Sequence, residues 1–322
     1  MLFLDYQLFP LCVETGIFMM EYDTFKEIIS ERICDYLPPV FNNYYPVIEN
    51  VAKINEKKDA LTLRSDDMDE RMAMPVIYLD EMYDVFKTSE DLDDVLECAA
   101  EIIVNFAGMF EDLDNLLDLE VQKDNIIPNL INTEMNEKLL RDAPHMNILD
   151  MSVIYRIMMK SPRGGYDSCV VTNSVLEELE IDQQELHELA IKNMKKVLPI
   201  EMNRISRTDD EKAHPEIPDT FTFISSRQRL YGASYILFED VLGEICAEIN
   251  CNRLFIIPFN INEICVTAAE DICLDNLVEI LYQSNREAES DREFLSNAIY
   301  CFDSEKGALS KAAAYQIKKG LN

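Results

Sequence analysis

Apolar residues recur at helical spacing over several stretches of the chain. In residues 24–37 they fall three or four positions apart, and the prolines at 38 and 39 then end the pattern, because proline cannot continue a helix. A longer stripe runs from Leu92 to Phe106, and Ser89 is the expected N-cap of that helix. Similar patterns predict helices at 126–141, 174–180, 182–197, 239–249 and 274–288.

Short apolar or alternating runs predict strands between these helices. In the first half of the chain the predicted strands are 44–54, 59–65, 75–79 and 148–158. In the second half they are SCVVT, TFTFIS, ASYILF, LFIIPF, EICVTA and NAIYCFD. Strands mixed with helices in this order argue against a helical bundle and indicate the α+β class.

The chain is expected to divide near 161–166, where Arg163 and two glycines form a turn. The apolar leader lacks the basic residues of a secretory signal. We expect one of two arrangements. Either the leader is wrongly included in the sequence or is disordered, with the true start at Met19 or Met20, or it forms a first strand or helix that packs on the core. The predicted parts are this leader (1–19), a helix-rich acidic N-terminal lobe with a small sheet (20–162), a C-terminal lobe of mixed β-sheet packed with helices (163–305) and a flexible tail (306–322).

The chain is strongly acidic, with 29 Lys and Arg against 61 Asp and Glu and a formal net charge of −32. Residues 1–150 carry −22 of this charge and residues 151–322 carry −10, while residues 80–120 alone hold 14 acids against one base. This balance argues against direct nucleic-acid binding. One acidic helix face is expected to be either a solvated surface or an interaction surface, and it consists of Asp91, Asp94, Glu97 and Glu101.

The nine cysteines predict reduced thiols and a cytoplasmic location. Their number is odd, no CxxC occurs, and Cys246 and Cys265 lie inside apolar runs, where a free thiol behaves as a small hydrophobe. No run approaches the roughly 18 apolar residues of a membrane span. We therefore expect no association with a membrane.

Familiar catalytic and cofactor motifs are absent or incomplete. The chain has no GxGxxG, GxxxxGK[ST] or GxSxG. A zinc-protease HExxH begins at His187 but has Ile191 where the second histidine must stand. A calcium loop begins at Asp112 but has Leu117 in place of glycine and Lys123 in place of glutamate. We therefore expect neither a metal nor a cofactor.

Candidate site residues are few. His145, Asp150 and Glu263 are weak catalytic candidates, with His145 able to activate a cysteine if one lies beside it. The alternative is that His145 is a structural cap or core contact. A basic group flanks an acidic loop and either neutralises that loop or binds an acidic or phosphorylated ligand; its members are Arg204, Arg207, Arg227 and Arg229.

Several segments together resemble one bacterial family. They are EYDTFKEII, PVIYLDEMYDVFKTSEDLDDVL, LINTEMNEKLLRDAPHMNILDMSVIY, ELHELAIKNMKKVLP, GASYILFEDVLGEICAEI, RLFIIPFNINEICV and LSNAIYCFD. Over most of 20–305 the chain is similar to the family catalogued as domain of unknown function 5688, common in anaerobic gut Firmicutes. The resemblance implies an architecture and a bacterial source rather than a reaction. Relatives often read proline, two serines, an apolar residue, histidine and glutamate where this chain has PFNINE at 258–263, so any serine or histidine chemistry there is lost.

Three functions from different classes fit these observations. A non-enzymatic cytoplasmic protein that binds an unidentified protein partner is favoured. The reason is that the sequence holds enough apolar residues for a complete core but no recognisable set of catalytic residues. An acidic protein that imitates nucleic acid and occupies a basic partner is suggested by residues 80–120. An enzyme with an unrecognised site is the third. The sequence leaves the oligomeric state open.

Overall fold

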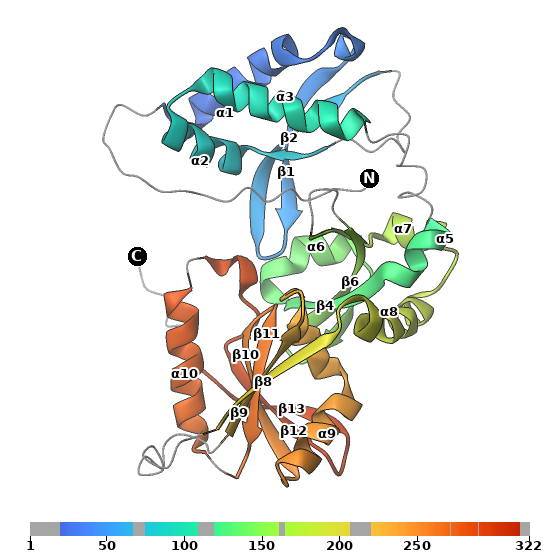
Figure 1. Ribbon diagram of the computed structural model, residues 1–322, viewed down its shortest axis with the longest axis vertical. Coiled ribbons are helices and arrows are strands. Elements are labelled where there is room, and N and C mark those ends of the chain that lie inside the picture. The colour runs from blue at the N-terminus through green and yellow to red at the C-terminus, as the bar shows by residue number, and fades with distance from the viewer. Residues whose placement is uncertain are drawn as a thin grey trace. The chain divides into compact units, whose positions relative to one another are not determined.

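The computed structural model describes residues 20–66, 75–108, 119–160, 165–206, 220–270, 272–288 and 290–315. The leader predicted at 1–19 lies outside them. The chain forms two compact units, coloured by residue number in Figure 1. The first unit comprises Met1–Lys53, Lys57–Lys123 and Ile157–Val170; the second comprises Ile54–Glu56, Asp124–Arg156 and Val171–Asn322. This division differs from the joint predicted at 161–166, since residues 124–156 belong to the second unit.

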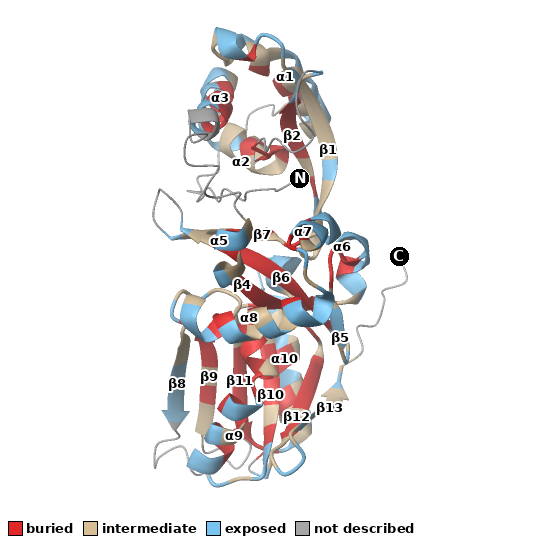
Figure 2. Ribbon diagram, turned by 90° about the vertical axis from the view of Figure 1, so that its right-hand side faces the viewer, coloured by how far each residue is buried: buried red, intermediate tan, exposed pale blue. Residues whose placement is uncertain are grey.

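In the first unit, three helices lie on one face of a small sheet (Figure 2). The strands are β1 (Tyr45–Lys53), β2 (Glu56–Arg64) and β3 (Ile77–Tyr78), in the order β1-β2-β3. The helices are α1 (Tyr22–Arg32), α2 (Leu79–Ser89) and α3 (Leu92–Gly108), with 3-10 turns at Ile33–Tyr36 and Pro39–Phe41. Phe25, Leu61 and Leu96 are fully buried in the core that joins them. These elements confirm the helices predicted at 24–37 and from Leu92 to Phe106 and the strands predicted at 44–54, 59–65 and 75–79.

The cap of α3 is Asp91 rather than the predicted Ser89. Asp91 Oδ1 accepts the N–H of Asp93 at 2.9 Å and that of Asp94 at 3.3 Å. These bonds satisfy donors that the first turn of a helix leaves without an intrahelical partner. Ser89 ends α2 instead, and Glu90, with φ of 56°, turns the chain between the two helices.

The larger sheet of the second unit has six strands in the order β13-β12-β10-β11-β9-β8. Their bounds are β8 Ile200–Ser206, β9 Thr220–Ser226, β10 Arg253–Asn260, β11 Glu263–Ala268, β12 Ala298–Asp303 and β13 Ala308–Ala314. Every neighbouring pair is antiparallel. The mixed sheet that the sequence analysis predicts for this lobe is therefore wrong for these six strands. Helix α10 (Leu274–Glu287) covers one face and α9 (Glu239–Glu248) the other (Figure 1).

A smaller sheet contains β4 (Ile126–Asn132), β6 (Met151–Lys160) and β5 (Met146–Ile148) in that order, with β7 (Tyr166–Val170) paired to β6. Helix α8 (Gln183–Val197) lies along β4. As predicted, α8 starts after Asp182, whose carboxylate accepts the Glu185 N–H at 2.8 Å. The remaining helical elements are α5 (Leu119–Gln122), α6 (Glu137–Asp142), α7 (Asn173–Glu178) and 3-10 turns at Lys123–Asn125, Glu134–Asn136, Gly232–Leu237 and Asp291–Glu293.

Three further predictions from local pattern are wrong, although the α+β class is confirmed. The helix predicted at 126–141 begins as the buried strand β4 and continues as two short helical turns. The strand predicted at ASYILF is the 3-10 turn Gly232–Leu237. The tail predicted at 306–322 begins with β13, and only 316–322 lie outside the described residues.

Candidate functional site

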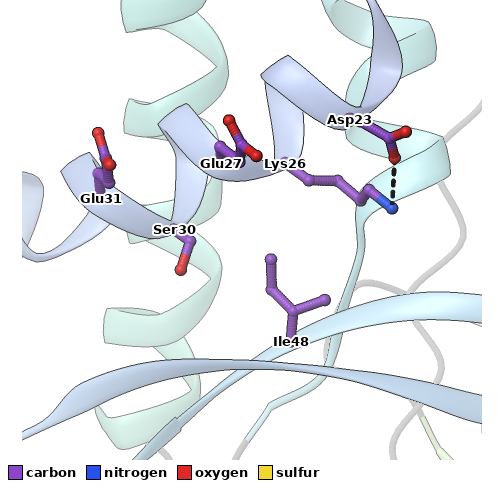
Figure 3. Close-up of a pocket in the computed structure, with 6 residues that line it drawn as sticks. All are labelled: Asp23, Lys26, Glu27, Ser30, Glu31 and Ile48. Atoms are coloured by element: carbon purple, nitrogen blue, oxygen red, sulfur yellow. Dashed lines mark ion pairs between the residues drawn. The ribbon is translucent and has the colours of Figure 1, made fainter.

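A groove of about 560 Å³ opens between α1 and β1 in the first unit (Figure 3). Its lining residues are Asp23, Lys26, Glu27, Ser30 and Glu31 of α1 and Ile48 of β1. In Figure 3 the side chain of Ile48 rises from the strand toward the helix. The groove therefore has an apolar floor and a polar wall that is rich in carboxylates.

The amphipathic pattern of α1 turns these polar residues away from the core. Phe25 and Ile29 are fully buried on the inner face. Asp23, Glu27 and Glu31 follow at intervals of four residues, which places them on another common face of the helix. Ile48 is partly buried against the same core, and this contact holds β1 beside α1.

The lysine of the groove is already neutralised. Lys26 Nζ lies 3.0 Å from Asp23 and 2.8 Å from Asp59 of β2. The hydrogen bond from Lys26 lowers the pKa of Asp59 and raises the pKa of Lys26, so both groups stay charged. Within the described part of the chain, Glu27 and Glu31 have no such cation. The groove consequently carries an excess of negative charge.

Sequence patterns alone do not single out this groove. The acids at 23, 27 and 31 are visible in the sequence, but they are typical of the solvated face of any helix. The contribution of Ile48 depends on how the hairpin lies against α1. The spacing of the acids is therefore the one signal that could have pointed to it.

Asp150 belongs to a buried network of the second unit. Its carboxylate accepts hydrogen bonds from Ser296 Oγ at 2.8 Å and Tyr300 OH at 2.9 Å, and Lys311 Nζ lies 3.0 Å away. Burial disfavours the charge of Asp150, but the bonds from Ser296, Lys311 and Tyr300 outweigh it and lower the pKa. Ser296 and Tyr300 are fully buried. Because the serine hydroxyl faces a carboxylate and not solvent, the network joins elements of the fold rather than presenting a nucleophile.

The other two candidate catalytic residues lie in different surroundings. His145 is half-buried, and its Nδ1 lies 2.9 Å from the carbonyl oxygen of Ala143 in the same turn. Glu263 is half-buried at the start of β11, where burial raises its pKa and the charge of Arg229 opposes that rise. The described contacts of His145, Asp150 and Glu263 share no residue. The structure therefore places them in three separate environments.

The four arginines do not share a described ligand. Arg204 of β8 pairs with Glu248 of α9 at 2.5 Å. Arg227 and Arg229 are exposed, and Arg229 adopts a left-handed φ of 55° in the turn after β9. Arg207 lies outside the described residues. The acidic loop that these arginines flank lies outside the described residues, and the partner of Arg204 belongs to α9 and not to that loop.

The acidic face predicted on α3 is solvent-exposed at Asp91, Asp94, Glu97 and Glu101. Asp91 is occupied as the helix cap. Asp94, Glu97 and Glu101 remain at helical spacing on one side. They form an acidic face on the same unit as the groove, which gives a matched surface for comparison.

His187, where the incomplete HExxH begins, is half-buried in α8. Its Nδ1 lies 3.2 Å from the hydroxyl of Tyr155, which is fully buried. Burial lowers the pKa of His187, and the nearby charge of Glu188 partly opposes that shift. Burial also raises the pKa of Tyr155, so its hydroxyl stays protonated beside the ring.

Acidification should therefore weaken the fold through His187. Because the folded-state pKa is lowered, the stability from the neutral ring is complete above the unfolded pKa of about 6.5 and is lost as pH falls through the folded pKa. In urea unfolding from about pH 7 to pH 5, the wild type should lose more stability than His187→Gln, which cannot become charged. Equal losses in the two proteins would contradict this assignment.

The cysteines of the described residues are free thiols, and Cys246 and Cys265 are buried as predicted. Burial raises the pKa of Cys246, and it raises that of Cys251 to about 12, which leaves little thiolate for nucleophilic attack. Across the described ranges, no three histidine, cysteine or acidic side chains are grouped to hold a metal ion. Within the same ranges, no helix has the length and apolar character needed to cross a membrane.

Comparison with known proteins places the chain in a family. No curated protein and no solved structure matches it. A family model described as a family of unknown function, DUF5688, matches residues 22–304. This span covers most of the chain and contains both sides of the α1–β1 groove. The chain therefore belongs to the DUF5688 family, as the likeness of its segments implied.

Proposed function

We propose that this protein is a protein-interaction module whose groove between α1 and β1 receives a positively charged segment of a partner protein. The observation that carries the proposal is the pair of exposed carboxylates, Glu27 and Glu31, which line a groove with an apolar floor and a lysine that is already neutralised. In Figure 3 both point away from Ile48, so they stand at the rim of the groove. Carboxylates that line a concave site focus their field on an incoming cation. The net charge of −32 adds long-range attraction for a basic partner.

The surroundings of the candidate catalytic residues support binding over catalysis. Ser296 is sealed from solvent beside Asp150, and His145 is engaged within its own turn. The groove, in contrast, is open and holds both charge and an apolar contact. Such a combination suits a basic side chain whose methylene stem packs on Ile48 while its cationic head meets a carboxylate.

Reversing the charge of the groove should abolish capture of the partner. With the full chain immobilised, Glu27→Lys/Glu31→Lys should reduce the bound partner by about tenfold or more, because each close charge pair is worth over one kcal/mol. Affinity pulldown from native lysate at low and high salt, with the bound protein quantified by mass spectrometry, measures this change. Both substitutions lie on an exposed helix face, so circular dichroism should show an intact fold.

The matched control is Glu97→Lys/Glu101→Lys on the exposed face of α3. It changes the net charge of the protein equally and on the same unit, but leaves the groove intact. Capture should persist in this control. Equal capture by the wild type and the groove variant would overturn the proposal.

A second candidate function is the imitation of nucleic acid by the acidic face of α3. The exposed carboxylates Asp94, Glu97 and Glu101 favour it, since they stand on one side of a long helix. In this case the α3 variant would lose the partner while the groove variant kept it. Binding would also weaken steeply with salt, as expected for contacts made only by exposed charges.

A further inference from the structure

Helix α9 ends in a Schellman motif, a common way for a helix to stop. Asn250 adopts a left-handed φ of 54° just after the helix, and the Cys251 N–H donates to the carbonyl oxygen of Cys246 at 3.0 Å. This hydrogen bond around a left-handed residue defines the motif, and the side chains of the two residues that it joins commonly pack together. In this protein both of those residues are cysteines.

The thiols of Cys246 and Cys251 are in contact. Burial raises the pKa of both cysteines, and a hydrogen bond between their side chains lowers the pKa of Cys246 and raises that of Cys251. A disulfide joins two cysteines whose sulfur atoms can approach to about 2 Å. Two thiols that already share a hydrogen bond can reach this separation by rotation of their side chains, without movement of the backbone.

The turn that carries Cys251 is held in place. The carbonyl oxygen of Asn252 accepts hydrogen bonds from the Ser304 N–H and from the Ser304 hydroxyl, both at 2.9 Å. These bonds tie the turn before β10 to the turn after β12. Cys246 is buried in α9, whereas Cys251 is partly exposed, so Cys251 is the thiol that a dissolved oxidant reaches first.

We propose that Cys246 and Cys251 form a reversible disulfide with a low-molecular-weight disulfide such as oxidised glutathione, and that this bond locks the end of α9. The thiolate of Cys251 attacks one sulfur of the oxidant, forms a mixed disulfide and releases one glutathione thiolate. The thiolate of Cys246 then attacks Cys251 Sγ, closes the protein disulfide and releases the second glutathione thiolate. The two thiol protons of the protein pass to these thiolates, and two electrons pass from the cysteines to the oxidant.

The environment of the pair sets the rate of this reaction. Burial raises the pKa of Cys251 to about 12, and only the thiolate attacks a disulfide. The reaction should therefore be slow at pH 7, and its rate should rise about tenfold per pH unit up to pH 9. The second step needs no encounter between molecules, because Cys246 already lies in contact with Cys251.

The test incubates the full chain with oxidised and reduced glutathione in varied ratios at pH 8. Free thiols are then blocked, and the protein is digested with a protease that cleaves after glutamate. Cleavage after Glu248 separates the two cysteines, so mass spectrometry should find a disulfide-linked pair of fragments that reduction releases. Cys273→Ser, which removes an exposed cysteine of the same unit, should keep the link. Cys251→Ser should lose it while circular dichroism shows an intact fold.

The linked protein should also have a higher midpoint of urea unfolding than the reduced protein, because a cross-link restricts the unfolded chain. This rise should be absent from Cys251→Ser. The proposal is overturned if Cys251 stays reduced or carries only glutathione at every ratio, or if Cys246 links instead to Cys301 of β12, which is also partly exposed. A linked protein with an unchanged midpoint would overturn the locking role.

Discussion

Gly232→Ala is expected to be among the most destabilising single changes in this protein. A Cβ at this position would lie 2.4 Å from the carbonyl oxygen of Asn262 and 2.5 Å from Cα of Ser225. Both contacts are with backbone, which cannot move aside as a flexible side chain can. Overpacking of this kind costs about 3 kcal/mol, or more where the backbone must shift. Urea unfolding followed by circular dichroism measures the loss.

Hydrogen bonds on both sides of Gly232 fix the close approach of its backbone to Ser225 and Asn262. Ser225 Oγ donates to the carbonyl oxygen of Asn262 at 2.7 Å, and the Tyr231 N–H donates to Asn262 Oδ1 at 2.9 Å. The Ala233 N–H also donates to the carbonyl oxygen of Ile261 at 3.3 Å. Because these bonds hold the end of β9 to the turn between β10 and β11, little relaxation is available to an added methyl group.

Gly243→Ala is the matched control for the same substitution. Gly243 lies within α9 of the same unit, and its added Cβ would meet nothing within 4 Å. Replacing a helical glycine with alanine at such a site should stabilise the protein by about 1 kcal/mol, because alanine has the higher helix propensity. Similar effects at positions 232 and 243 would contradict the close approach described for Gly232.

Asp150→Ala is the second substitution with a large expected effect. It removes the acceptor that Ser296 and Tyr300 share. Tyr300 OH can still donate to Ser296 Oγ at 2.7 Å, but the fully buried hydroxyl of Ser296 then loses its own acceptor. Breaking a buried charged network in this way costs about 3 kcal/mol. The fold should persist at neutral pH with a lower midpoint of urea unfolding.

Removing the exposed partner of the same network gives the control. Lys311 pairs with Asp150 at 3.0 Å but its side chain is 41% exposed, so Lys311→Ala should cost less than about 1 kcal/mol. If Lys311→Ala costs as much as Asp150→Ala, the attraction between charges and not the buried hydrogen bonds dominates the network. That outcome would overturn the structural role given to Ser296 and Tyr300.

The difference between the wild type and Asp150→Ala should also depend on pH. The folded-state pKa of Asp150 is lowered by its hydrogen bonds. Its contribution is therefore complete above the unfolded pKa of about 3.9 and is lost as pH falls through the folded pKa. Unfolding curves of the two proteins should converge in acid.

The sequence by itself determined those elements whose apolar face is visible as a pattern along the chain. For these elements, tertiary packing only buries the face that the pattern already marks. Helix α8 shows this, since the cap at Asp182 and the stripe through Leu186, Ala190 and Met194 suffice to define it. Strands β10 and β11 follow from their apolar runs in the same way. The membership of the DUF5688 family was likewise readable from segment likeness along the chain.

Tertiary contacts decided the elements in which local pattern is silent or ambiguous. All seven residues of β4 are buried, so no alternation distinguishes a strand from a helix, and pairing with β6 under α8 settles the choice. β8 and β13 lie at the two ends of their sheet. β8 mixes apolar and polar residues without strict alternation, and β13 consists mostly of alanine, which has a low strand propensity. Pairing with β9 and β12 makes them strands.

For the groove, too, the sequence determined one part and the tertiary structure the other. The sequence by itself determined that α1 is amphipathic and that its outer face is acidic, because helical periodicity fixes which residues share a face. Only the tertiary structure decided that β1 lies beside this helix as an edge strand with Ile48 between them. The physical reason is that a contact between elements depends on burial shared by residues distant in sequence, which no local pattern records.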